Sequence, residues 1–194
     1  MNSCVGVLAL QGAFAAHSEC LTSIGVQSVE VRTPEQLNSV DALLMPGGES
    51  STMSQLLESS GLFDPIAARI ANGMPTFGTC AGMILLSSEI LDGRSDQRSF
   101  NAIDISVRRN AFGRQVDSFE SDIDTRVGQF HGVFIRAPRI ERVGAEVEVL
   151  GRLGDEPILV QQGNVMAASF HPELSHDVRL HEYFISLMPT AGKV

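Results

Sequence analysis

Residues 76–86 read TFGTCAGMILL, which places Cys80 between a short expected strand and an apolar expected helix. Gly78 and Gly82 flank this junction, and glycine permits both a sharp turn and the close approach of a substrate to the backbone. The pattern is typical of a nucleophile elbow, with sulfur in place of a hydroxyl. A helix N-terminus also favours a thiolate and supplies backbone N–H donors. Cys80 is therefore predicted to be a nucleophile, the alternative being a buried structural cysteine.

Strand and helix patterns alternate in the first half of the chain, up to residue 91. Strands are expected at residues 5–10, 26–31, 42–45 and 76–79. Helices are expected at residues 13–23, 53–60, 63–71 and 82–91. Thr52 and Gln55 have the spacing of a capping box for the second of these helices. Such alternation predicts a parallel sheet covered by helices.

After residue 92 the sequence changes to runs in which apolar residues alternate with polar ones, as is typical of strands. Strands are expected at residues 103–107, 133–135, 147–150, 158–162 and 165–170. Gly163 and Asn164 predict a hairpin turn between the last two. Ser175 is expected to cap a final helix that Pro189 ends. Two polar segments, 92–99 and 118–129, are expected to be surface loops.

The whole pattern predicts an α/β fold of three layers. A mostly parallel, flavodoxin-like central sheet is expected to carry helices on both faces, with an antiparallel hairpin extension near the C-terminus. No repeat, low-complexity tract or linker interrupts the 194 residues. We therefore expect a single domain over residues 1–194.

Composition excludes several classes of partner and compartment. The chain has 14 basic and 23 acidic residues and a formal charge of −9, which disfavours nucleic acids and anionic membrane surfaces. No apolar run approaches the roughly 20 residues that a membrane span needs, and no basic region precedes the first apolar stretch. Cys4, Cys20 and Cys80 form neither a disulfide framework nor a metal-ligand spacing. A cytoplasmic chain without metal or cofactor is expected.

A cysteine nucleophile works with an imidazole that holds its proton and a third group that orients the imidazole. His171 and Glu173 lie two residues apart at the end of the expected strand 165–170, so both side chains are expected to leave on the same face. Glu173 can then orient His171 and complete a triad with Cys80. The alternative is a pair of exposed polar residues at a strand end. Zinc-ligand spacing is lacking among the remaining histidines, which are His17, His131, His176 and His181.

Residues 45–51 read MPGGESS, a glycine-rich turn at the carboxyl end of an expected strand, where open α/β sheets bind ligands. The missing P-loop lysine and the absent GxGxxG pattern argue against a phosphate. An oxyanion hole needs only backbone N–H groups, and Gly48 with Ala81 can supply a convergent pair. The alternative is a tight loop that holds no ligand.

Three motifs carry a resemblance to a known family. The PGGES loop at 46–50, the GTCAG elbow at 78–82 and the HPE triplet at 171–173, in this order and spacing, resemble the class I (triad) glutamine amidotransferases. LALQGAF at 8–14, RNAFGRQ at 109–115 and FIRAP at 134–138 make the chain similar to the glutaminase subunits of pyridoxal 5'-phosphate synthases. The resemblance spans nearly the whole chain. It departs at 97–102, where QRSFNA replaces a leucine- and glycine-rich stretch, which puts only local loop packing in doubt.

The resemblance implies a reaction. Cys80 would attack the side-chain amide of L-glutamine and form a thioester, and His171, oriented by Glu173, would protonate departing ammonia and then activate water. The implied oxyanion donors are backbone N–H groups near Gly48 and Ala81. The implied glutamine pocket is lined by Gly48, Glu49, Ser50, Arg109, Ile135 and Arg136. A guanidinium and a carboxylate together can bind both ends of an amino acid, whereas without the family these arginines would be taken for solvated surface charge.

The resemblance also implies a partner. Ammonia escapes into water, so such a glutaminase docks on an acceptor, here a (β/α)₈-barrel synthase subunit that makes pyridoxal 5'-phosphate in a large hetero-oligomer. The only lysine is Lys193, so Schiff-base chemistry would lie on that partner, whose binding is expected to raise a weak basal activity. Three alternatives stay open: a stand-alone cysteine hydrolase of another amide or γ-glutamyl bond, a non-catalytic binding subunit, and an amidotransferase subunit that serves a different acceptor.

Overall fold

The structure is a computed structural model that describes residues 4–109 and 118–189. Five parallel strands carry the nucleophile elbow: β1 (Cys4–Leu8), β2 (Gln27–Val31), β3 (Ala42–Met45), β4 (Thr76–Thr79) and β12 (Val165–Ala168). They lie in the order β2-β1-β3-β4-β12. This is the flavodoxin-like order, in which ligands bind at the carboxyl ends of the strands. The expected α/β class and parallel sheet are confirmed.

Four antiparallel strands extend the same sheet beyond β12. They are β11 (Glu156–Gln162), β10 (Glu148–Leu153), β7 (Ser118–Thr125) and β8 (Gly128–Ile135), in that order. Gln162 pairs with Val165 across the expected two-residue turn, in which Gly163 has a φ of 57°. The predicted hairpin is therefore present, and it begins a longer antiparallel region.

The prediction of a surface loop at residues 118–129 is wrong, because β7 and the start of β8 occupy this segment. Its composition hid the strand, since Ile123 is the one residue of β7 that is buried. Pairing runs along the whole of β7, from Ser118 opposite Ile135 to Thr125 opposite Gly128. Backbone pairing with a neighbouring strand thus gives a polar segment its structure.

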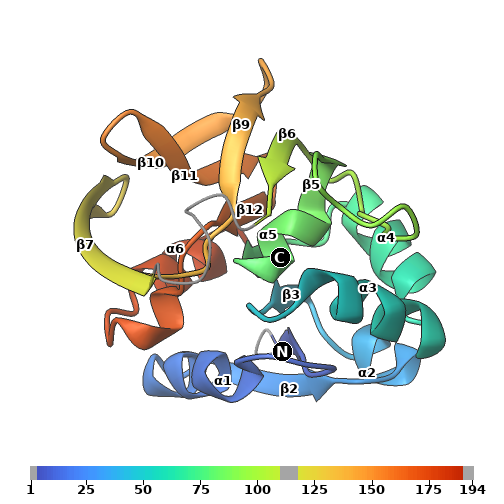
Figure 1. Ribbon diagram of the computed structural model, residues 1–194. Helices are drawn as coiled ribbons and strands as arrows, with labels where there is room; N and C mark the ends of the chain where they lie inside the picture. The colour runs from blue at the N-terminus through green and yellow to red at the C-terminus, as the bar shows by residue number, and fades with distance from the viewer. Residues whose placement is uncertain (1–3, 110–117, 190–194) are drawn as a thin grey trace.

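Helices cover both faces of the parallel strands and complete the three layers (Figure 1). On one face, Val7 and Leu44 of the sheet share a core with Leu21 of α1 and Phe184 of α6. On the other face, Leu43 shares a core with the remaining helices. The helices are α1 (Phe14–Ser23), α2 (Pro34–Asn38), α3 (Ser50–Ser59), α4 (Phe63–Ala71), α5 (Ala81–Leu86) and α6 (Arg179–Ser186).

A second, three-stranded sheet consists of β5 (Ser87–Ile90), β6 (Ile103–Arg108) and β9 (Arg139–Val143) in the order β5-β6-β9. The helix expected over residues 82–91 is wrong in its second half, because α5 ends at Leu86 and β5 follows. Ser87 turns to extended backbone there, and its hydroxyl donates to the carbonyl of Ile84 at 2.7 Å. Pairing of β5 with β6 overrides the local helical pattern.

Two expected helix starts are also wrong. Helix α3 begins at Ser50 rather than 53, because the Glu49 carboxylate accepts the backbone N–H groups of Ser51 at 3.1 Å and Thr52 at 2.7 Å. The capping box expected at Thr52 is therefore absent. Helix α6 begins at Arg179 without a side-chain cap, while Ser175 ends the short 3₁₀ helix η1 (Pro172–Leu174).

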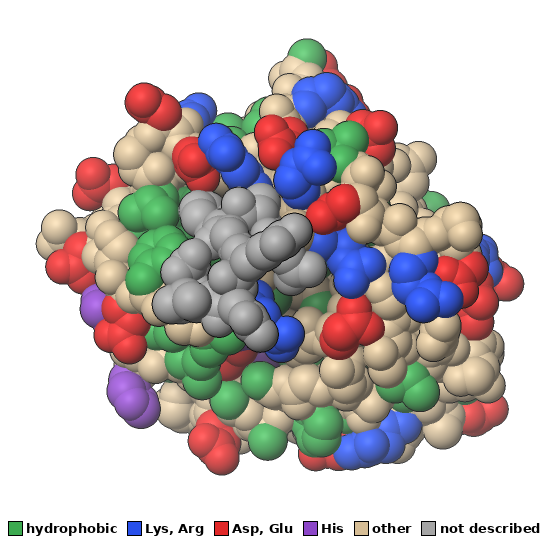
Figure 2. All heavy atoms as spheres, viewed as in Figure 1, with side chains coloured by type: hydrophobic (Ala, Val, Ile, Leu, Met, Phe, Trp, Pro, Cys, Tyr) green, Lys and Arg blue, Asp and Glu red, His purple; other side chains and the backbone are tan. Residues whose placement is uncertain are grey.

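The visible surface mixes charges of both signs. Figure 2 shows basic and acidic side chains interspersed on this face. Within residues 4–109 and 118–189, no helix is both long and apolar enough to cross a membrane. The stretch 110–115, which contributed to the family resemblance, and Lys193 lie outside the described residues.

Candidate active site

Cys80 lies at the turn from β4 into α5, with a φ of 49° and a ψ of −103°. Non-glycine residues rarely take a positive φ, and such strain is concentrated at functional sites. The Cys80 backbone N–H donates to the carbonyl of Ala168 on β12 at 2.8 Å, which ties the turn to the sheet. A Cβ added at Gly82 would lie 2.2 Å from the carbonyl oxygen of Met45. The absence of a side chain at Gly82 lets α5 pack closely against β3, which the sharp turn at Cys80 requires.

His171 and Glu173 meet through a turn rather than through a strand. Strand β12 ends at Ala168, so the expected same-face alternation along residues 165–170 does not apply. Instead His171 precedes η1, which curls the chain until Glu173 Oε1 lies 2.8 Å from His171 Nδ1. Both residues are buried, and the side chain of Glu173 is fully enclosed. With Nδ1 bonded to Glu173, the Nε2 atom of His171 is left for the sulfur.

The charges of this pair support each other. Burial alone would lower the pKa of His171, but its interactions with Cys80 and Glu173 prevail and raise it to about 10. The pKa of Glu173 is lowered, because its interactions with His17 and His171 outweigh the effect of burial. Since the pKa of His17 is about 4, His17 is neutral at pH 7, and His171 is then the cation beside Glu173. The arrangement stabilises an imidazolium next to the cysteine.

The loop at residues 46–49 presses against the cysteine and the histidine. A Cβ added at Gly47 would lie 2.4 Å from His171 Cε1 and 3.3 Å from the Cβ of Cys80. On its other side, a Cβ at Gly12 would lie 1.7 Å from the Gly47 carbonyl oxygen. Gln11 holds the same loop, since its Oε1 accepts the backbone N–H of Glu49 at 3.2 Å. The glycine-rich loop is therefore packed between the turn that follows β1 and the reactive groups.

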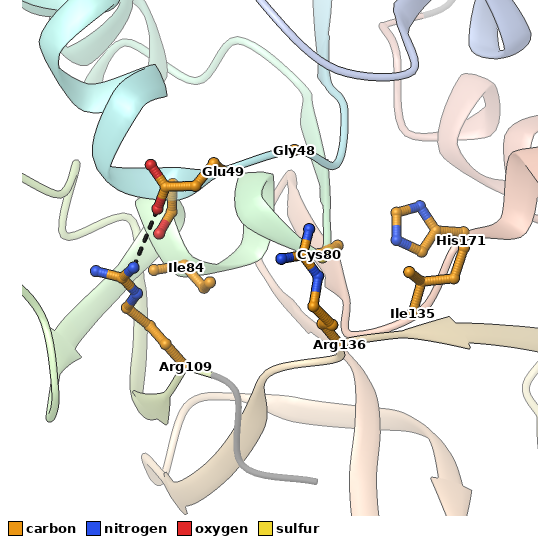
Figure 3. Close-up of a pocket in the computed structure, with 9 residues that line it drawn as sticks. Gly48, Glu49, Cys80, Ile84, Arg109, Ile135, Arg136 and His171 are labelled. Carbon is orange, nitrogen blue, oxygen red and sulfur yellow. Dashed lines mark hydrogen bonds and ion pairs between the residues drawn. The ribbon is translucent and has the colours of Figure 1, made fainter. Parts of the chain in front are cut away.

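A cavity of about 190 Å³ opens at the carboxyl ends of β3 and β4 (Figure 3). It brings together Cys80, His171 and all six residues that the resemblance assigned to a glutamine pocket. One further residue, Ile84 on α5, had not been singled out from the sequence. Glu173 lies behind His171, and Ala81 follows Cys80 as a buried first residue of α5. The lining residues are Gly48, Glu49, Ser50, Cys80, Ile84, Arg109, Ile135, Arg136 and His171.

One side of the cavity is a hydrogen-bonded network centred on Arg109, whose ion pair with Glu49 is drawn in Figure 3. Its guanidinium donates to Glu49 Oε1 at 3.0 Å, to Ser51 Oγ at 2.7 Å and to Gln97 Oε1 at 2.8 Å. The Gln97 amide in turn donates to Ser50 Oγ at 3.1 Å. Burial alone would raise the pKa of Glu49. Hydrogen bonds from α3 and the charge of Arg109 outweigh this effect and lower the pKa to about 2. A cation and an anion are therefore held side by side at the cavity.

Sequence reasoning missed Gln97, which lies in the segment where the chain departs from the family pattern. No local signal marks this residue, because its partners come from α3 and from the end of β6. Within the described parts of the chain, no group of three or more His, Cys, Asp or Glu side chains could hold a metal ion.

Comparison with known proteins identifies relatives over nearly the whole length. The family model described as the SNO glutamine amidotransferase family matches residues 7–189. A protein of Corynebacterium jeikeium named "Pyridoxal 5'-phosphate synthase subunit PdxT" is 53% identical over 97% of this chain and 98% of its own length. A protein of Pelotomaculum thermopropionicum with the same name is 52% identical over 97% of each chain.

Solved structures agree with this assignment. A crystal structure of a glutamine amidotransferase superposes with a TM-score of 0.90 at 52% identity, covering 94% of this chain and 97% of that one. PurLQS from Thermotoga maritima superposes with a TM-score of 0.67 at 15% identity, covering 96% and 99%, and at this identity the likeness shows the fold alone. On the family match and the identities above, the chain belongs to the SNO glutamine amidotransferase family.

Proposed function

We propose that the protein is a glutaminase that hydrolyses L-glutamine to L-glutamate and ammonia and passes the ammonia to a synthase subunit for pyridoxal 5'-phosphate biosynthesis. One observation carries the chemical part: Cys80 and His171 border the same cavity as the paired charges of Glu49 and Arg109. The names of relatives at about half identity support the biosynthetic part.

The proposed reaction proceeds through a thioester on Cys80. The thiolate attacks the amide carbon of glutamine, and the resulting tetrahedral intermediate expels ammonia after His171 Nε2 delivers a proton to the nitrogen. His171 then takes a proton from water, whose oxygen attacks the thioester and releases glutamate and the thiolate. Glu173 keeps His171 in the tautomer and orientation that both steps need, as its 2.8 Å contact with Nδ1 supports.

The developing oxyanion needs preorganised donors. We assign this role to the backbone N–H groups of Gly48 and Ala81. Support comes from their positions: Gly48 borders the cavity, and Ala81 begins the helix that follows the nucleophile. A helix N-terminus adds a partial positive charge in the same place.

Recognition of the amino-acid end of glutamine is assigned to the charged side of the cavity. The Glu49 carboxylate suits the α-ammonium group, and the guanidinium groups of Arg109 and Arg136 suit the α-carboxylate. Ser50 and Ile135 complete the pocket as a polar and an apolar wall. Because Glu49 and Arg109 are already paired at 3.0 Å, the substrate meets a preorganised pair of charges rather than two mobile side chains.

The chain is proposed to act as one domain over residues 1–194, in the cytoplasm, docked on a (β/α)₈-barrel synthase within a large hetero-oligomer. Ammonia is mostly protonated at neutral pH and diffuses away, so direct delivery makes the hydrolysis useful. Docking is expected to raise the activity of the free chain by favouring the conformation that completes the oxyanion hole.

Glutamate release from L-glutamine tests this proposal, measured with and without the synthase subunit. Wild type should be active and stimulated by the synthase, Cys80→Ala should be inactive, and the matched control Cys4→Ala should equal wild type. Release by Cys80→Ala at the wild-type rate would exclude the mechanism. Full activity without the synthase would favour the stand-alone hydrolase instead.

A further inference from the structure

Two histidines that the proposed reaction does not use lie buried behind the site. His17 on α1 and His181 on α6 are both fully inaccessible to solvent. Neither borders the cavity. Their surroundings are otherwise apolar, since α1 and α6 pack Leu21 and Phe184 into the core of this face. Polar groups buried in such a place are costly unless they are hydrogen-bonded.

His17 stands at the junction of three elements. Its Nδ1 atom lies 3.0 Å from Nε2 of His181, and its Nε2 atom lies 3.2 Å from the hydroxyl of Thr79. The same Nε2 atom is 3.3 Å from Oε2 of Glu173. One imidazole therefore contacts both the residue that precedes Cys80 and the carboxylate that orients His171.

Each of the two carboxylate oxygens of Glu173 therefore lies near a different histidine. Oε1 meets His171 at 2.8 Å. Oε2 is buried and has no hydrogen-bond partner among the described residues, and His17 Nε2 lies 3.3 Å from it. A buried carboxylate oxygen needs a donor facing it. His17 Nε2, which also has a 3.2 Å hydrogen bond with Thr79 Oγ1, is within reach to be that donor.

His17, the histidine near Oε2 of Glu173, is neutral at pH 7. Burial lowers the pKa of His17 to about 4 and that of His181 to about 3. The other titratable groups around Glu173 are His171 and, on α1, Cys20, whose thiol lies 3.9 Å from the Glu173 carbonyl oxygen and whose pKa burial raises. At neutral pH, His171 is therefore the positive charge in contact with the carboxylate.

The negative charge of Glu173 selects the tautomer of His17. With the proton on Nε2, the ring has an N–H within reach of both Oε2 and the Thr79 hydroxyl, while an Nε2 lone pair in this place would repel the carboxylate. Nδ1 is then an acceptor, so His181 must donate through its own Nε2–H. This assignment leaves His181 Nδ1 as an acceptor, and that atom has no hydrogen-bond partner among the described residues.

We propose that His17 is a positioning residue for the triad: its neutral Nε2–H holds the Glu173 carboxylate so that Oε1 faces His171, and His181 fixes the tautomer of His17. The role rests on the proposed glutaminase function. It resembles the outer partners that orient catalytic and metal-bound side chains in other sites. Contact with Thr79 also ties the same ring to the strand that carries Cys80.

Two amide variants separate positioning from core filling. A glutamine at position 17 can place an amide N–H where Nε2 lies, whereas the shorter asparagine reaches only the Nδ1 position. With L-glutamine and the synthase present, His17→Asn should lower kcat about tenfold, the effect of one hydrogen bond to a charged group, with KM unchanged. Its basic pH limb should move to lower pH, because a misplaced carboxylate stabilises the His171 imidazolium less. His17→Gln should recover most of the rate, and the exposed control His131→Asn should equal wild type.

Each outcome decides between the two claims. If wild type and Cys80→Ala release glutamate equally, the glutaminase proposal fails whatever His17 does. If wild type is active and His17→Asn shares its kcat and pH profile, or if His17→Gln and His17→Asn are equally impaired, the positioning role is wrong.

A spectroscopic measurement on the wild-type chain avoids any dependence on variants that fold poorly. In protein labelled with ¹⁵N-histidine, NMR should show His17 as the neutral Nε2–H tautomer throughout pH 5 to 9. An Nδ1–H tautomer, or protonation of His17 within that range, would overturn the assignment.

Discussion

Cys80 and Arg136 both border the cavity with positive φ angles, of 49° and 45°. This conformation costs a non-glycine residue on the order of 1 kcal/mol or more, and it persists only where the surroundings enforce it. At Cys80 the surroundings are β12 and β3, which pair with β4 on either side, as far as Thr79 and Gly78 respectively. The direction of the reactive sulfur is therefore set by backbone pairing, while its charge environment is set by His171.

The charge of His171 gives a pH dependence. Its pKa is raised to about 10, so the imidazolium persists through neutral pH and activity should decline only as pH rises toward 10. Glu173→Gln removes the neighbouring negative charge, so the pKa of His171 should fall and the basic limb should move to lower pH. We expect kcat to fall about a hundredfold. Profiles of kcat/KM from pH 6 to 11 test this against the exposed control Glu182→Gln, and an unmoved basic limb in Glu173→Gln would contradict it.

Gln97 provides a second residue-scale prediction. Its amide accepts from Arg109 and donates to Ser50, so Gln97→Ala should loosen both cavity-lining residues. Loss of one such hydrogen bond is worth about 1 kcal/mol, which corresponds to roughly a fivefold increase in KM. We expect kcat to change little, because neither Cys80 nor His171 contacts this amide. Steady-state kinetics beside the exposed control Asp96→Asn check the result, and an unchanged KM would show that Gln97 does not brace the pocket.

At the scale of elements, the site is assembled from the carboxyl ends of neighbouring parallel strands. The loop after β3, the elbow after β4 and the η1 turn after β12 converge there, and Gln11 in the turn after β1 supports the first of them. Helices α3 and α5 both begin at the cavity, so their N-termini add partial positive charge near the reacting groups. Small shifts of the 46–49 loop therefore act directly on the reactive residues.

A matched pair of glycines tests the packing of that loop. Gly12 and Gly25 have φ angles of 89° and 74°, so alanine is strained at both, by about 1 kcal/mol. Only at Gly12 does the new Cβ collide, 1.7 Å from the Gly47 carbonyl oxygen, whereas Gly25 has open space. Gly12→Ala should therefore cost at least about 1 kcal/mol more than Gly25→Ala in urea unfolding and should abolish most activity. Equal stability and activity of the two variants would show that the loop is not held as described.

Sequence patterns predicted the parallel half of the molecule better than the rest, for physical reasons. β3 is fully buried and apolar throughout, and β4, although it holds Thr76 and Thr79, is fully buried and leads into the glycine-flanked Cys80, so both strands are clearly marked in the sequence. β7 exposes most of its side chains, and its structure comes from pairing with β8 and β10. β5 follows a helical pattern but pairs with β6. Pairing between segments far apart in the sequence leaves no local signal.

The residues of the candidate site likewise fall into those that local sequence patterns could predict and those that only tertiary packing brings together. Cys80 with its glycines, and the pair His171 and Glu173, are close in sequence, so their grouping was predictable. Gln97 and His17 reach the site only through tertiary packing. The cap of α3 was assigned to Thr52 from spacing, but Glu49 takes that role because its two oxygens accept two N–H groups.

At the scale of the whole molecule, the pH dependence of stability is set by buried histidines whose pKa values shift in opposite directions. His17 and His181 have folded pKa values lowered to about 4 and 3, so burying them as neutral rings stabilises the fold above the unfolded value near 6.5. That stability is lost as pH falls toward 4. His171 acts in the opposite sense, since its raised pKa stabilises the fold below about 6.5 and this contribution is lost as pH rises through about 10.

The free energy of unfolding should therefore be greatest near pH 6.5. Below that pH, each buried neutral histidine contributes a slope of about 1.4 kcal/mol per pH unit, because the unfolded state binds one more proton. Urea unfolding from pH 4.5 to 7 should show a shallower slope for His181→Leu than for wild type, whatever its absolute stability. Identical slopes would mean that His181 is not buried as a neutral ring.

The most direct test of the central claim is to capture the covalent intermediate. The chain, with the synthase subunit, is mixed with L-glutamine, quenched in acid within the first turnovers and analysed by intact-mass and peptide mass spectrometry. The account predicts a mass gain of one glutamyl group on the peptide that contains Cys80, absent in Cys80→Ala and unaffected in Cys4→Ala. Glutamate release by wild type with no adduct on Cys80, or an adduct that persists in Cys80→Ala, would contradict it.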